Sequence, residues 1–249
     1  MRVDKMIGNT GLDTRKNIKK NAKKGALVIN GEIVKDSSVK VDPLVDEVFY
    51  MGHFVEYIEN IYLILNKPAG VLSATQDPSK TVIDLLDDFY LNYDLSIAGR
   101  LDKDTTGLVL LSTDGKFIHR ITSPNSNITK TYEVKTRDPI DKNLVDEFKN
   151  GVYIKEDDYT ARPAELIIKG EKEATVKVTE GKYHLVKRLF SNLGNEVVAL
   201  TRVAIGDLLL DPYLKEGDYR ELTEKELELF RWGEFSHENT CKKDISVIR

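Results

Sequence analysis

Two carboxylates, Asp102 and Asp104, stand between Gly99 and the apolar run Leu108–Leu111. That run is short, apolar and bounded by turn residues, so it predicts a buried strand. Asp102 is therefore expected on an irregular loop held by a rigid strand, a common position for a functional side chain. An ionised carboxylate there can act as a nucleophile. An ordinary turn, in which Asp and Thr side chains bond to their own backbone, explains the same residues without any chemistry.

Further elements must position such a loop. Apolar or alternating runs predict strands at 61–65, 131–135, 160–168 and 173–178. Amphipathic spacing predicts helices at 82–86, 116–121 and 141–150, and Thr223 is an N-cap candidate for a last helix. Residues 90–93 read as loop, and the weakly patterned stretch 52–60 is the expected linker between two domains.

The N-terminal region differs from the rest in charge. Residues 1–25 carry eight Lys or Arg against two Asp, although the whole chain has a net charge of −4. Thr14 is a predicted N-cap for a helix over Arg15–Lys24, Gly25 ends it, and Asn30-Gly31 marks a hairpin. The basic residues of that helix recur on one face, as expected for contact with phosphates. A solvated lysine-rich face is the simpler explanation.

Length and composition limit the class of protein. A chain of 249 residues with 41% hydrophobic and 31% charged residues is expected to form one or two globular domains. No apolar run approaches the roughly 18–20 residues that cross a bilayer, and the N-terminus lacks a secretory signal. The single Cys241 excludes an internal disulfide and a multi-cysteine zinc site. We expect a cytoplasmic monomer.

Four motifs in order carry a family resemblance. They are N-K-P-A-G-V-L-S-A-T at 66–75, G-R-L-D-K-D-T-T-G-L-V-L-L-S-T-D-G at 99–115, K-T-Y-E-V at 130–134 and E-G-K-Y-H-L-V-K-R-L-F at 180–190. Together they resemble the RNA pseudouridine synthases of the Rsu/Rlu type. The Tyr-His pair of the last motif is similar to the branch that acts on small-subunit ribosomal RNA. With the elements above, the resemblance implies an α+β catalytic domain with a mixed, largely antiparallel sheet and flanking helices.

The resemblance also implies roles for individual residues. Asp102 corresponds to the family's nucleophile, Lys187 to the cation that pairs with it, and Tyr132 to the aromatic residue that stacks on the target base. Arg100 corresponds to the residue that fills the gap left by that base, and Lys67 and Arg188 are further candidates for RNA contact. Leu185 stands where the family has Gln. No cofactor and no metal are expected.

The same resemblance suggests the domain organisation and the partner. Residues 1–58 resemble the ribosomal-protein S-four-like RNA-binding domain, 59–234 the catalytic domain, and 235–249 a polar tail. The partner implied is ribosomal RNA or an assembling small ribosomal subunit. The expected RNA contacts of the first domain are Arg2, Lys5, Arg15, Lys16, Lys19, Lys20, Lys23 and Lys24.

Two other functions fit parts of the sequence. Residues 102–106 match D-x-D-x-T and residues 206–211 match G-D-x-x-x-D, patterns of magnesium-dependent haloacid-dehalogenase-type phosphatases. That chemistry requires a long apolar strand directly before the first acid, and residues 96–101 do not form one. A calcium loop would need Glu at its twelfth position, where Thr113 stands. A catalytically silent RNA-binding or ribosome-assembly protein would need the basic N-terminal region alone.

Overall fold

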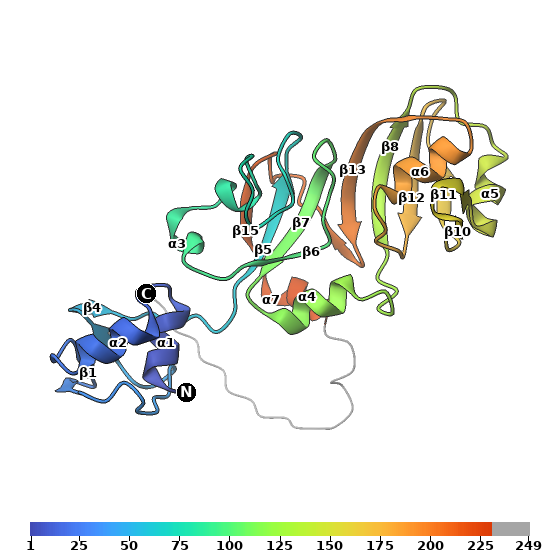
Figure 1. Ribbon diagram of the computed structural model, residues 1–249. Helices are drawn as coiled ribbons and strands as arrows, with labels where there is room; N and C mark the ends of the chain where they lie inside the picture. The colour runs from blue at the N-terminus through green and yellow to red at the C-terminus, as the bar shows by residue number, and fades with distance from the viewer. Residues whose placement is uncertain (231–249) are drawn as a thin grey trace, which may run out of the picture.

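A computed structural model describes residues 1–230, and Figure 1 shows the chain. The polar tail expected at 235–249, with Cys241 in it, lies outside the described residues, as do 231–234. Within the described part, no helix is long and apolar enough to cross a membrane.

The N-terminal region forms a sheet covered by two helices. Strands β1 (Leu27–Ile29), β2 (Glu32–Ile33), β3 (Val48–Tyr50) and β4 (His53–Phe54) pair in the order β2-β1-β3-β4, all antiparallel. Helices α1 (Val3–Asn9) and α2 (Arg15–Ala22) bury their apolar residues against it. The Thr14 hydroxyl accepts a hydrogen bond from the backbone N–H of Asn17, so the predicted cap is confirmed.

The second sheet carries most of the remaining chain. Its strand order is β11-β12-β8-β13-β7-β5-β15, with β14 on β13 and β6 on β7. The strands are β5 (Tyr62–Lys67), β6 (Ser96–Ala98), β7 (Thr106–Ser112), β8 (Lys130–Thr136), β11 (Glu165–Ile168), β12 (Glu173–Val178), β13 (Val197–Ile205), β14 (Leu208–Leu209) and β15 (Tyr219–Glu221). A separate small hairpin joins β9 (Tyr153–Ile154) to β10 (Tyr159–Thr160). The expected α+β class with a mixed, largely antiparallel sheet is confirmed.

Strands β7 and β13 make the one parallel pairing among the described strands of this sheet. Their register joins Thr201 to Thr106 and Arg202 to Gly107. Figure 1 shows the two strands diverging from this contact, with β5, β7 and β15 on one side and β8, β11 and β12 on the other. Each half has its own buried clusters, so the junction is the place where two separately packed halves meet.

Helices flank both halves of the sheet. Helices α4 (Gly115–Thr122) and α7 (Glu224–Glu228) lie against the β5–β7 half, while α5 (Leu144–Asn150) and α6 (Leu185–Asn192) lie against the other (Figure 1). The helix predicted at 82–86 is a short 3-10 helix, Ile83–Leu85, and another 3-10 helix follows at Lys155–Asp157. The expected loop at 90–93 is wrong in part, because α3 spans Asp88–Leu91.

Candidate active site

The loop that carries Asp102 runs from β6 to β7 and is fixed by the surrounding backbone. The N–H of Leu101 donates to the Ser73 hydroxyl at 3.0 Å, and the N–H of Thr105 donates to the Asp102 carbonyl at 3.1 Å. A local turn of the kind the sequence allowed is therefore present. Tertiary hydrogen bonds hold it as well.

Lys67 is one of these tertiary anchors, so the expectation that it contacts RNA is wrong. Its side chain is completely buried, and its ammonium donates to the carbonyls of Pro68, Lys103 and Thr105 at 2.9, 3.2 and 2.8 Å. Burial lowers the pKa of Lys67 to about 8, although the negative charges of Asp104 and Asp102 act to raise it. An ammonium enclosed in this way holds the loop and cannot reach a phosphate.

Two glycines let this loop lie against β13. Gly107 has φ +103°, and a Cβ there would lie 2.3 Å from the carbonyl oxygen of Arg202. Gly99 has φ +82°, and its Cβ would lie 3.4 Å from a guanidinium nitrogen of Arg202. Arg202 is buried and donates through Nε to the Leu108 carbonyl at 2.8 Å and through its guanidinium to the Gly99 carbonyl at 2.7 Å. Gly99 and Gly107 thus allow the loop to approach β13 closely, and the hydrogen bonds from Arg202 hold the two segments together.

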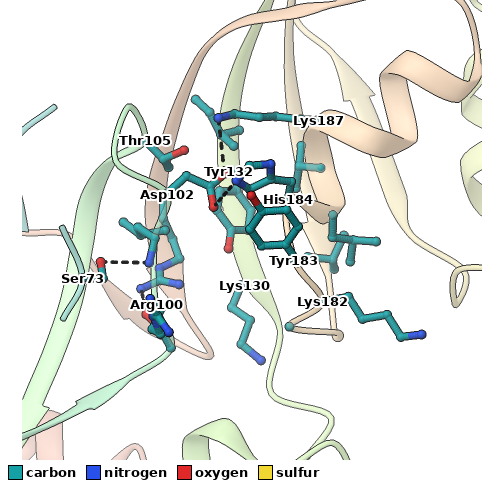
Figure 2. A pocket seen from close by; sticks show the side chains of 18 of the residues that line it. Ser73, Arg100, Asp102, Thr105, Lys130, Tyr132, Lys182, Tyr183, His184 and Lys187 are labelled. Atoms are coloured by element: carbon teal, nitrogen blue, oxygen red, sulfur yellow. Dashed lines mark hydrogen bonds and ion pairs between the residues drawn. The ribbon is translucent and has the colours of Figure 1, made fainter. Parts of the chain in front are cut away.

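Both carboxylate oxygens of Asp102 face positively charged or N–H-bearing side chains of the segment around α6. Lys187 Nζ lies 3.3 Å from Oδ2, and His184 Nε2 lies 3.3 Å from Oδ1 (Figure 2). Lys187 also bonds Asp104 at 2.6 Å. Burial alone would lower the pKa of Lys187, but the bond to Asp104 and the charge of Asp102 raise it above its usual value. The same hydrogen bond lowers the pKa of Asp104.

Aromatic side chains stand beside the carboxylate. Tyr132 on β8 is half-buried and lines the same pocket. Tyr183 is 75% exposed and stacks on the His184 ring, with centroids 3.6 Å apart and planes 20° apart. His184 is the N-cap of α6 and has φ +49°, a conformation that non-glycine residues rarely adopt. This backbone turns the imidazole toward Asp102.

The pocket around these groups is large enough for a nucleotide. Its volume is about 890 Å³, and it lies at the β7–β13 junction between the Asp102 loop, β8 and the segment before α6. Ligand pockets usually measure about 300–1,000 Å³. The three residues expected to act together, Asp102, Tyr132 and Lys187, all line it. No group of three or more His, Cys, Asp or Glu in residues 1–230 is arranged to hold a metal ion.

The expected RNA-contacting residues divide into free and paired ones. Arg100 is exposed and lines the pocket. Arg188 forms ion pairs with Asp157 at 2.8 Å and Glu156 at 3.7 Å, and Arg2 pairs with Asp4 at 2.6 Å. The other seven are exposed and form no ion pair within the described part of the chain: Lys5, Arg15, Lys16, Lys19, Lys20, Lys23 and Lys24.

Three pocket residues were not foreseen as site residues: His184, Arg202 and Lys130. Lys130 and His184 lie inside two of the four motifs, so the motifs were the available signal for them, whereas Arg202 lies outside all four. His184 served only to choose between branches of the family. The contacts of Arg202 and the burial of Lys130 depend on the β7–β13 junction, which no local pattern reveals.

Comparisons with known proteins identify the family. Residues 61–226 match the family model described as RNA pseudouridylate synthase. An RNA pseudouridine synthase of Bacillus subtilis (strain 168), itself described as uncharacterized, is 46% identical over 92% of this chain and 98% of its own length. Ribosomal small subunit pseudouridine synthase A of Haemophilus influenzae is 43% identical, with 92% and 98% covered.

A solved structure agrees with these sequence matches. The crystal structure of a pseudouridylate synthase superposes with a TM-score of 0.67 at 40% identity, and covers 93% of this chain and 100% of that one. The resemblance drawn from the four motifs is confirmed, and with it the expected isomerase activity on RNA. The chain belongs to the RNA pseudouridylate synthase family.

Proposed function

We propose that this enzyme converts a specific uridine of small-subunit ribosomal RNA to pseudouridine, with Asp102 as its nucleophile and without a cofactor. One observation carries the assignment of the nucleophile. Among the pocket carboxylates, Asp102 has one oxygen against Lys187 and the other against His184, beside the half-buried Tyr132. The name of the Haemophilus influenzae relative supports the choice of substrate.

The reaction requires few groups, and the pocket has candidates for the nucleophile, for the cation that orients it and for the residue that stacks on the base. The bond between ribose C1′ and uracil N1 breaks, the base turns and C5 bonds to C1′. C5 loses its proton and N1 gains one, so the product is an isomer of uridine. Asp102 attacks either C1′ or uracil C6, and the ion pair with Lys187 orients the carboxylate. Tyr132 stacks on the base. A uridine in structured RNA must first flip out, at a cost of a few kcal/mol, and Arg100 at the pocket mouth fills the gap it leaves.

Residues 1–58 act as a separate RNA-binding module in this proposal. Its apolar residues form a buried cluster of their own, and the exposed cations of α2 lie opposite the inward-facing Ile18 and Ala22. Cations in such a row neutralise phosphates and orient the protein on RNA without reading its sequence. Selection of the uridine then depends on the pocket and on the shape of the RNA around it.

Pseudouridine mapping tests the proposed function. Ribosomal RNA from cells with and without the protein is modified with carbodiimide and read by primer extension. We expect one small-subunit site to disappear, and to return with the wild-type protein but not with Asp102→Asn. Loss of a large-subunit site would keep the chemistry and overturn the substrate. An unchanged map would favour the silent RNA-binding protein.

A further inference from the structure

Lys130 is a largely buried side chain that lines the pocket, and its ammonium remains accessible to solvent there. The residue is 6% exposed, and it lies two residues before Tyr132 on β8, so both side chains emerge on the same face of the sheet. Figure 2 shows Lys187 above Asp102 and Lys130 below it, with the Lys130 ammonium pointing away from Lys187. Within residues 1–230, no hydrogen bond or ion pair engages this ammonium.

The charges around Lys130 do not compensate it. Arg202 is the nearby cation, and its bonds go to the carbonyls of Leu108 and Gly99. Burial and the charge of Arg202 lower the pKa of Lys130. A charge that is partly removed from water and has no partner is unfavourable, so a ligand of opposite charge would stabilise this site.

The carboxylates of the pocket are already engaged by other groups. Asp102 and Asp104 share Lys187, and Asp102 also faces His184. Glu180 accepts hydrogen bonds from the Tyr159 hydroxyl and from the backbone N–H of Arg162. The end of the pocket formed by Lys130, Arg202 and Arg100 is therefore positive, while the end at Lys187 holds two carboxylates against one ammonium.

We propose that Lys130, with Arg202 behind it and Arg100 at the mouth, binds a phosphodiester group next to the flipped uridine. This inference rests on the proposed function, and it names the chemical group that the positive end of the pocket recognises. The Lys130 ammonium then holds the nucleotide by its backbone, while Asp102 and Tyr132 engage the sugar and the base. A charge-assisted contact of this kind orients the nucleotide without selecting its base.

Neutral backbone linkages test the proposal. The RNA found by mapping is synthesised with a single methylphosphonate on either the 5′ or the 3′ side of the target uridine. We expect one of the two to lower kcat/KM of the wild type about tenfold or more, and Lys130→Met to lower it by a similar factor on the natural RNA. The two changes together should cost no more than either alone.

A matched variant shows whether this coupling is specific. Lys182 also lines the pocket, but its ammonium lies over the Tyr159 ring, 3.2 Å from the centroid. Any loss caused by Lys182→Met should therefore add to the loss caused by the neutral linkage. Equal activity of the wild type on the natural RNA and on both methylphosphonate RNAs would overturn the proposal. It would also be overturned if the loss caused by Lys130→Met added to the loss caused by each of the two neutral linkages. Unfolding curves check that Lys130→Met is folded.

A binding measurement separates this proposal from the proposed function. Uridine 3′,5′-bisphosphate and uridine are titrated into the wild type and Lys130→Met, and binding is followed by nuclear magnetic resonance. We expect the wild type to prefer the bisphosphate about tenfold or more, and the variant to lose that preference. This result would support the phosphate site even if ribosomal RNA proved not to be the substrate. The same preference in both proteins, or none in the wild type, would refute it.

Discussion

Replacing Lys187 by Met tests whether the ion pair with Asp102 is required for turnover. Methionine keeps much of the side-chain length and removes the charge. Charges 3.3 Å apart interact by about 5 kcal/mol at an effective dielectric constant of 20 and by about 1 kcal/mol in bulk water. The two side chains are 23% and 21% exposed, so a value near 3 kcal/mol is reasonable. If this energy aims the carboxylate, the correctly placed fraction falls about 100-fold.

The expected loss should appear in the chemical step. RNA labelled with tritium at uracil C5 releases the label when pseudouridine forms, and excess enzyme makes the measurement a single turnover. We expect Lys187→Met to lower this rate about 100-fold, with little change in RNA affinity. Asp104→Asn is the control, because Asp104 takes the shorter bond to Lys187 but its side chain is 74% exposed. We expect it to stay within about threefold of the wild type.

Two results would refute this reasoning. A Lys187→Met rate within about threefold of the wild type would show that the ion pair does not orient the nucleophile. A loss in Asp104→Asn as large as in Lys187→Met would show that Lys187 acts through Asp104. Thermal unfolding of each variant distinguishes either result from loss of the fold.

Three other predictions concern separate contacts. His184→Ala should slow single turnover about tenfold, and His184→Gln should restore most of the rate, since an amide can still donate to Asp102; equal rates for both variants would contradict this role. Changing the three lysines of α2 and its C-cap Lys23 to Gln should reduce the slope of log affinity against log salt by up to about 3, and an unchanged slope would exclude α2 from RNA contact. The hydrogen bond from Arg220 lowers the pKa of Glu226 to about 2, so this pair stabilises the fold above about pH 4.5 and the contribution is lost as pH falls toward 2. Urea unfolding should show Glu226→Gln destabilised by about 2 kcal/mol at pH 7 and equal to the wild type near pH 2.

Much of the fold was predictable because its signals are local. The apolar run before Ser112 forms β7, and Thr223 caps α7 through a complete capping box, as the sequence suggested. Helix α1 was missed because seven residues are too few for a periodicity to stand out. Helix α3 was missed because it is shorter still and is held from far along the chain, by Tyr90 bonding to Glu221 at 2.9 Å.

Only the site residues whose roles follow from the four motifs could be predicted from the sequence. Asp102, Tyr132 and Lys187 come from three motifs, and the structure brings them into one pocket. The contact from His184 to Asp102 depends on a left-handed backbone at residue 184, and an imidazole in a sequence gives no local sign of that conformation. Arg202 is similar, since its carbonyl partners Gly99 and Leu108 lie about a hundred residues earlier in the chain.

Two lysines show why residue type alone does not identify a binding site. Lys67 and Lys130 both stand in family motifs, both are buried, and burial lowers the pKa of each. Lys67 has three carbonyl partners, two of them supplied by the loop 103–105 when it folds back over β5. Lys130 has none within the described residues, because β12 and β13, its neighbours in the sheet, give it backbone pairing and no acceptor for its ammonium. The difference lies in the tertiary contacts of the two side chains. The Lys67 ammonium is taken up by backbone carbonyls and supports the loop, whereas the Lys130 ammonium stays free to bind the RNA backbone.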